Sequence, residues 1–466
     1  MKLITTLILG CCIFLFTAYP QSGVTIKINP HDPGSLIPTR FIGLSFETAS
    51  LLPDYAEVKG YFFDSTNTQL LTLFKNIGIK SLRIGGGTVD KPQVPIPKLA
   101  DIDALFRFAK AAGVKVIYSF RLQNGDSLQD ASTVKYIWKK YRQYLDHFSI
   151  GNEPNYKFMD PTITDYSTFL AKWRRFADVV LDSVPYAKLG GPDAAGSKWG
   201  EDFGKDEFGS GIVDITYFHN YTGRSAEGKT PHEMIDKMLS PVWDTANYPS
   251  LYERVSTTGF PYSFTEANSF TADKVGVWGG NNCFATALYA LDYLYWWAEH
   301  NCQGVHYHTY QWKYNGTITK DDKGNFQINP MGYGIKAFDL GGHGRMKHLS
   351  ISNPDNINLT AYAVQDTTGL FITIINKEHG SAMRNAKVNI LVDDITGNAS
   401  VIFLNSPHGV SDITGMTLGG SQITNSETWK GKWALIKTTS AKKKYYTVDV
   451  PASSAAIIKI IKTNNY

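Results

Sequence analysis

Between Arg40 and Tyr310, short runs rich in Val, Ile, Phe and Tyr alternate with longer stretches whose apolar residues recur at helical spacing. This alternation predicts repeated strand and helix units around a parallel sheet. Stretches such as Ile102–Ala112 and Asp165–Val184 fit as helices between the strands. Eight units over roughly 270 residues match the size of a (β/α)8 TIM barrel. The eight predicted strands are Phe41–Glu47, Ile79–Gly85, Val114–Phe120, His147–Asn152, Lys188–Pro192, Val213–His219, Tyr262–Glu266 and Gly304–Thr309.

After about Leu340 the pattern changes to short strands separated by Gly, Asn, Asp and Ser turns, which predicts an antiparallel β-sandwich domain. An early strand, Val24–Asn29, alternates apolar and polar residues, and we expect it to join that sandwich. The predicted organisation is a leader over residues 1–22, the N-terminal strand over 23–35, the barrel over 36–340 and the sandwich over 341–466. The predicted sandwich strands are Leu359–Val364, Leu370–Ile375, Ala386–Val392, Val401–Leu404, Trp433–Lys437 and Ala455–Ile461.

The N-terminus has one positive residue, Lys2, followed by an apolar stretch from Leu3 to Ala18 and then polar residues. This pattern is typical of a secretory signal peptide and predicts a secreted or periplasmic protein. A lipoprotein with lipid on Cys11 is the less favoured alternative, because further apolar residues follow Cys12. No other segment is long and apolar enough to span a membrane. Cys283 and Cys302 lie in the mature chain and can pair across one helix, but no disulfide framework is implied.

Composition narrows the class of protein. Hydrophobic residues make up 43% of the chain and charged residues 19%, a balance that predicts a globular protein. The net charge of +4 is too small and dispersed to favour nucleic acid as a partner. The 11 histidines form no His-Glu-x-x-His pattern, and Cys-x-x-Cys is absent, so we expect neither a metal ion nor a cofactor. We expect the protein to be a monomer.

Two glutamates occupy matching positions, Glu153 directly after the fourth predicted strand and Glu266 at the end of the seventh. In a parallel barrel the C-terminal strand ends surround one cavity, and the fourth and seventh strands face each other across it. Two carboxyl groups flanking an anomeric carbon can cleave a glycosidic bond, and those of a retaining enzyme lie about 5–5.5 Å apart. Either glutamate alone is also explained by a salt bridge or a helix cap. The presence of both glutamates at these strand ends favours a catalytic pair.

Neighbouring residues suit the same chemistry. The Asn152 amide, directly before Glu153, can donate to a sugar 2-hydroxyl, or it is a turn residue before Pro154. At the end of the sixth strand, a hydroxyl or imidazole from Thr216–Tyr221 can point at Glu266 and keep its carboxylate ionised. A lone histidine such as His219 is, however, more often a core residue. Arg83, before the glycine run Gly85–Gly87, either supports Glu266 or forms an ion pair elsewhere in the barrel.

With these residues assembled, the chain resembles glycoside hydrolase family 79, the heparanase and β-glucuronidase family of clan A. The resemblance implies a retaining hydrolase with Glu153 as acid/base and Glu266 as nucleophile. It further implies that Glu47 and Asn152 bind sugar hydroxyls and that His219 and Tyr221 flank the nucleophile. The matching stretches are Phe41–Glu47, Leu82–Gly86 with Asp90, Ile150–Asn155, His219–Tyr221, Phe264–Ser269 and Ala287–Leu294.

The family's substrates carry glucuronic acid, whose carboxylate is held by backbone N–H groups and a tyrosine. The resemblance places these groups at Gly276, in the loop from Gly276 to Gly280, and at Tyr333. The expected partner is therefore a glycan or glycoside that contains glucuronic acid.

The chain also departs from the family pattern. The short connection from Thr88 to Gly113 leaves no room for an excised linker, so we expect one uncut chain. Arg121 either contacts an acidic substrate or faces solvent, and the loop Trp278–Asn282 differs from the family type. Two other functions therefore stay open: a clan A retaining glycosidase for a neutral sugar such as xylose, arabinose or galactose, and a noncatalytic carbohydrate-binding barrel.

Overall fold

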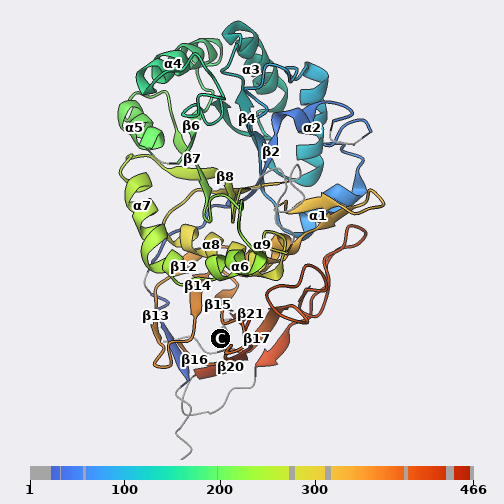
Figure 1. Ribbon diagram of the computed structural model, residues 1–466, viewed down its shortest axis with the longest axis vertical. Helices are drawn as coiled ribbons and strands as arrows, with labels where there is room; N and C mark the ends of the chain where they lie inside the picture. Colours follow the sequence, from blue (N-terminus) through green and yellow to red (C-terminus); the bar gives the residue numbers. More distant parts are fainter. Residues whose placement is uncertain are drawn as a thin grey trace, which may run out of the picture.

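The computed structural model describes residues 23–31, 33–55, 59–196, 198–271, 279–309, 316–392, 397–436 and 445–461. The predicted signal peptide, residues 1–22, lies outside this range. Figure 1 shows a barrel of strands ringed by helices, with a smaller β-sheet domain packed against one side of it.

The barrel contains the eight predicted strands in a parallel sheet ordered β5-β4-β3-β2-β9-β8-β7-β6. The ring closes between its two ends, where the Phe148 amide donates to the Lys188 carbonyl at 2.8 Å and Phe148 bridges in parallel to Leu189. The predicted fold class, a TIM barrel with a C-terminal sandwich, is confirmed. The strands are β2 (Ile42–Glu47), β3 (Ser81–Gly85), β4 (Lys115–Phe120), β5 (Leu145–Ile150), β6 (Gly190–Ala195), β7 (Ile215–Tyr221), β8 (Tyr262–Asn268) and β9 (Val305–His308).

Helices cover the outside of the barrel and begin where polar residues can cap them. In α4 (Tyr166–Ser183), the Asp165 side chain accepts a hydrogen bond from the Thr168 amide at 2.8 Å, and Phe169 and Trp173 are buried against the barrel. The other helices are α1 (Thr68–Asn76), α2 (Leu99–Ala112), α3 (Ser127–Tyr141), α5 (Lys198–Glu207), α6 (Pro231–Met238), α7 (Tyr248–Ser256), α8 (Phe284–Glu299) and α9 (Pro330–Gly341), with single turns at Thr48–Leu51 and Trp243–Asn247.

The smaller domain consists of two sheets. In β16, alternate residues are buried, as expected for a strand with one face on a core. The N-terminal strand β1 pairs with β16 in parallel, Val24 opposite Val388, and with β13 in antiparallel orientation, so it belongs to this domain. The sheets are ordered β13-β1-β16-β20 and β12-β14-β15-β21-β17-β18. β19 (Ala434–Ile436) pairs with β17, and β10 (Ile318–Lys320) with β11 (Phe326–Ile328) forms a separate hairpin. The strands of the two sheets are β13 (Leu349–Ser352), β1 (Val24–Ile28), β16 (Ala386–Val392), β20 (Tyr445–Val450), β12 (Arg345–Lys347), β14 (Leu359–Gln365), β15 (Gly369–Asn376), β21 (Ser454–Ile461), β17 (Ala399–Asn405) and β18 (Thr417–Leu418).

A buried charge cluster joins the two domains. Lys377 of the sandwich donates to Asp244 at 2.5 Å and to Asp292 of α8 at 2.8 Å. Asp292 also accepts from the hydroxyls of Thr360 and Tyr362. Because a buried charge needs partners to be tolerated, this cluster fixes how the sandwich sits on α8.

Two sequence features can be placed in the fold. Cys283 and Cys302 are both free and buried. Among the described helices, none combines the length and the apolar character needed to cross a membrane.

Candidate active site

The two predicted glutamates converge at the C-terminal ends of the barrel strands. Glu266 lies within β8, and Glu153 follows β5 with a positive φ of 46°. The Glu153 amide donates to the carbonyl of Asp193 at 2.8 Å, which holds this conformation. His219 Nδ1 lies 3.1 Å from Glu153 Oε1 and 3.6 Å from Glu266 Oε2. These two oxygens are therefore at most about 6.7 Å apart, a limit compatible with the ~5–5.5 Å separation of a retaining pair.

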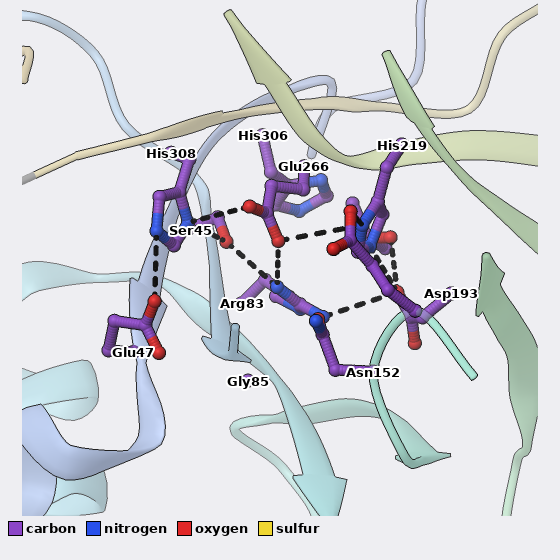
Figure 2. A network of polar contacts seen from close by, with 12 residues as sticks. Ser45, Glu47, Arg83, Gly85, Asn152, Asp193, His219, Glu266, His306 and His308 are labelled. Atoms are coloured by element: carbon purple, nitrogen blue, oxygen red, sulfur yellow. Dashed lines mark hydrogen bonds and ion pairs between the residues drawn. The ribbon is translucent and has the colours of Figure 1, made fainter. Parts of the chain in front are cut away.

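Glu266 is surrounded by hydrogen-bond donors and positive charge (Figure 2). Arg83 Nη1 donates to Oε2 at 3.0 Å, and the Tyr221 hydroxyl donates to Oε1 at 2.6 Å. Burial alone would raise the pKa of Glu266, but the charges of His308, His219 and Arg83 and the hydrogen bond from Tyr221 outweigh it and lower the pKa to about 2. The site therefore keeps this carboxylate ionised.

Arg83 is completely buried and contacts four residues of the site. Besides Glu266, its guanidinium donates to Asn152 Oδ1 at 2.7 Å and to Ser45 Oγ at 3.2 Å. Nη2 also lies 3.5 Å from Asp193. The predicted contact between Arg83 and Glu266 is confirmed, and the planar guanidinium orients the amide of Asn152 at the same time.

The glycine run after Arg83 makes room for these polar side chains. A Cβ on Gly85 would lie 2.5 Å from the Arg83 guanidinium carbon. A Cβ on Gly86, whose φ is +69°, would lie 2.6 Å from the carboxyl group of Glu47. At both positions the backbone therefore leaves no space for a side chain.

His219 contacts both glutamates and is held by Asp193, a residue that the sequence analysis did not identify. His219 Nε2 lies 3.3 Å from Asp193 Oδ1. Burial would lower the pKa of His219, but Glu266, Asp193 and Glu153 raise it to about 9. Asp193 is itself buried and accepts hydrogen bonds from Ser149 and Thr265. The fifth strand was predicted to end at Pro192, whereas β6 continues to Ala195 and includes Asp193. The rule of strand-end residues would have indicated Asp193.

Glu47 sits at the end of β2, where the Thr88 amide and hydroxyl donate to its Oε2 at 2.7 and 2.6 Å. His308, which the sequence analysis also did not identify, ends β9 with Nε2 3.5 Å from Glu47 Oε1 and Nδ1 3.7 Å from Glu266 Oε1. Burial opposes charge on His308, but Glu266 and Glu47 outweigh it and raise its pKa. His308 therefore links the predicted sugar-binding glutamate to the predicted nucleophile.

Asp90 ties the surrounding loops together. Its carboxyl group accepts from the amides of Asn152 and Leu122, both at 2.7 Å, and from Gln123 at 2.9 Å. Burial raises the pKa of Asp90 to about 6, although these amides oppose the shift. Nearby, Arg121 donates to the backbone carbonyls of residues 89, 91 and 94, so its guanidinium supports the loop after β3.

A cavity of about 660 Å³ opens over the ends of β5 to β8, and Glu153, His219, Tyr221 and Glu266 line it. The structure thus brings together six predicted site residues: Glu47, Asn152, Glu153, His219, Tyr221 and Glu266. It does not bring Tyr333 to the site, because this residue is buried in α9 and its hydroxyl accepts a hydrogen bond from the Ile423 amide of the sandwich domain at 3.0 Å. Gly276 lies outside the described residues. The described part of the chain holds no cluster of His, Cys, Asp and Glu suited to a metal ion.

No family model and no curated protein matches this chain. Solved structures do resemble it. A family 51 α-L-arabinofuranosidase from Bifidobacterium longum has a TM-score of 0.71 at 13% identity, with 94% of this chain and 99% of that chain covered. A 4-O-α-L-rhamnosyl-β-D-glucuronidase from Fusarium oxysporum has a TM-score of 0.69 at 17% identity, with 93% and 100% covered. A monomeric β-xylosidase from Caulobacter crescentus has a TM-score of 0.59 at 14% identity, with 94% and 99% covered. The chain therefore has the fold of clan A glycoside hydrolases.

Proposed function

We propose that the protein is a retaining glycoside hydrolase that acts by double displacement through a covalent glycosyl-enzyme. One observation carries the proposal: Glu153 and Glu266, from opposite sides of the barrel mouth, approach the same nitrogen of His219 at 3.1 and 3.6 Å. An anomeric carbon between them would meet a carboxyl group on each side, as the retaining mechanism requires.

The surroundings assign the two roles. Ionised Glu266 attacks the anomeric carbon and forms a bond to it, while the bond to the leaving oxygen breaks and Glu153 gives its proton to that oxygen. A water molecule then attacks the same carbon, Glu153 takes up its proton, and Glu266 is released. Two inversions at one carbon give net retention. Glu266 suits the first role because its pKa is held at about 2.

Asn152 and Glu47 are placed to bind the sugar. Arg83 donates to the Asn152 oxygen, which leaves the amide nitrogen to donate to a sugar 2-hydroxyl, a contact that strengthens in the transition state. Glu47 Oε2 is held by Thr88, and its carboxylate is ionised because hydrogen bonds and the charge of His308 outweigh burial and lower its pKa. A fixed carboxylate of this kind can accept a sugar hydroxyl hydrogen bond.

For the substrate we propose a β-glucuronide, the finer assignment implied by the motif resemblance. Arg224 lines the cavity, and its guanidinium forms no ion pair with any described residue, so it is available to a uronate carboxylate. The neutral-sugar alternative has equal support from solved structures, which include α-L-arabinofuranosidases and a β-xylosidase. Secretion and a monomeric state stay predictions of the sequence.

A panel of nitrophenyl glycosides tests the assignment, with β-glucuronide, β-xyloside, β-galactoside and α-L-arabinofuranoside as substrates. We expect kcat/KM to be highest for the glucuronide and proton NMR to show the β-anomer as the first product. In Arg224→Gln, kcat/KM for the glucuronide should fall about tenfold relative to that of the xyloside, the value of one charged hydrogen bond. Arg254→Gln is the matched control, since Arg254 lines the same cavity but is paired to Glu201 at 2.8 Å.

The possible outcomes are distinct. A higher kcat/KM for a neutral glycoside would replace the glucuronide with the neutral-sugar alternative and leave the glycosidase proposal intact. An α-anomer as the first product from a β-glycoside would contradict double displacement. No turnover of any glycoside would favour a noncatalytic carbohydrate-binding barrel.

A further inference from the structure

Two aromatic rings stand exposed beside the predicted acid/base. Tyr156 and Phe158 lie in the loop after β5, with side chains 43% and 73% exposed. The rings stack on each other, with centroids 5.2 Å apart and planes 16° apart. Tyr156 lines the same cavity as Glu153 and Glu266.

The fold does not require these rings. Neither ring belongs to the hydrophobic core clusters of the described residues. Exposed aromatic rings leave apolar surface in water, a cost that a bound ligand would remove. Their position at the mouth of the barrel, rather than at its opposite end, indicates that this ligand enters the cavity.

The loop that carries the pair is held in one conformation. The Tyr156 amide donates to the Glu153 carbonyl, and the Met159 amide donates to the Tyr156 carbonyl, both at 2.9 Å. Asp160 is buried and accepts from Lys172 of α4 at 2.6 Å. The backbone at Tyr156 is therefore held next to Glu153, which lowers the entropy cost of presenting its ring to a ligand.

The side of the cavity identifies the part of the substrate that would bind there. Glu47 and Asn152, the residues placed for the cleaved sugar, lie at the ends of β2 and β5. Glu153 and Tyr156 form the wall of the cavity at the loop after β5. An acid/base residue faces the leaving oxygen. The group attached to that oxygen therefore lies next to Glu153 and within reach of Tyr156.

We propose that Tyr156, supported by Phe158, forms the leaving-group subsite and stacks on the apolar face of a sugar ring of the glycan substrate. The inference rests on the proposed glycosidase function. An aromatic aglycone offers the same flat apolar face, so the test compares the two kinds of ring.

Substrates with one glycone and three leaving groups test the subsite: a glycosyl fluoride, a phenyl glycoside and a disaccharide. In Tyr156→Ala, kcat/KM for the disaccharide should fall about tenfold more than that for the fluoride, because the fluoride presents no ring to stack. Phe158→Ala should lower the ratio of kcat/KM for the disaccharide to kcat/KM for the fluoride by a smaller factor. Tyr156→Phe keeps the ring and should restore the ratio to that of the unmodified protein.

Tyr186→Ala is the matched control, because Tyr186 is 81% exposed but lies between α4 and β6, at the opposite end of the barrel. It should leave all three rates unchanged. Equal falls for fluoride and disaccharide in Tyr156→Ala would overturn the subsite while leaving the glycosidase in place. A selective fall for the phenyl glycoside alone would overturn the sugar-ring assignment. Absence of turnover of every fluoride would overturn the proposed function itself, and the subsite with it.

Discussion

The two glutamates at the barrel mouth have contrasting surroundings. Glu266 receives hydrogen bonds from Arg83 and Tyr221 and faces two histidines, and its pKa is held at about 2. Glu153 is in contact with His219, and its side chain is 15% exposed at the wall of the cavity. The two glutamates therefore differ in their neighbours and in their access to the cavity, as the two roles proposed for them require.

The largest expected effect comes from removing Glu266, the proposed nucleophile. Glu266→Ala should lower kcat for an aryl glycoside about 10⁴-fold or more, because no covalent intermediate can form. Azide should restore turnover by entering the space of the missing carboxylate and attacking the anomeric carbon of a dinitrophenyl glycoside. The glycosyl azide formed should have the inverted configuration, which proton NMR reads directly.

The matched variant is Glu153→Ala, in which azide enters from the leaving-group side after the glycosyl-enzyme has formed. Its product should keep the configuration of the substrate. If Glu266→Ala gave the retained azide and Glu153→Ala the inverted one, the two roles would have to be exchanged.

A smaller and more selective effect is expected for Glu153→Ala without azide. Loss of the general acid should lower kcat/KM about 10²- to 10⁴-fold for a sugar leaving group, which needs a proton to depart. A dinitrophenolate needs no proton, so its rate of release should change little. The slope of log kcat/KM against leaving-group pKa measures this difference. A slope equal to that of the unmodified protein would show that Glu153 gives no proton.

The same comparison shows how far the sequence could predict the site. Both glutamates were predicted because strand ends in a parallel barrel share one cavity, a rule that needs only the order of strands. Asp193 and His308 follow the same rule and could have been found at the ends of the fifth and eighth strands.

Other features depend on geometry that the strand order does not contain. One nitrogen of His219 faces both glutamates. This placement depends on the register of β7 against β8, which shifts between Phe218 and His219. Tyr333 was assigned from a loose motif match, and the packing of α9 against the sandwich decided its position instead. Prediction from sequence therefore succeeds for strand ends and fails where a side chain depends on the contact between domains.

The smallest expected effect tests what holds His219 between the glutamates. Four charged groups from four elements face its ring: Glu153 after β5, Asp193 of β6, Glu266 of β8 and Arg83 of β3. Asp193→Asn removes one negative partner, so the pKa of His219 should fall from about 9 toward its ordinary 6.5. At pH 8 kcat/KM should fall about tenfold, the value of one hydrogen bond worth ~1.4 kcal/mol.

The sign of the pH dependence distinguishes this role from general destabilisation. Because folding raises the pKa of His219 above its unfolded value of 6.5, its contribution to stability is complete below pH 6.5 and is lost as pH rises through about 9. In Asp193→Asn that loss should begin at lower pH, and the alkaline limb of kcat/KM should move in the same direction. Thermal unfolding and kcat/KM measured from pH 6 to pH 10 on both proteins check this. A uniform fall in Tm and rate at every pH, with no movement of the alkaline limb, would show that Asp193 supports the fold without controlling the charge of His219.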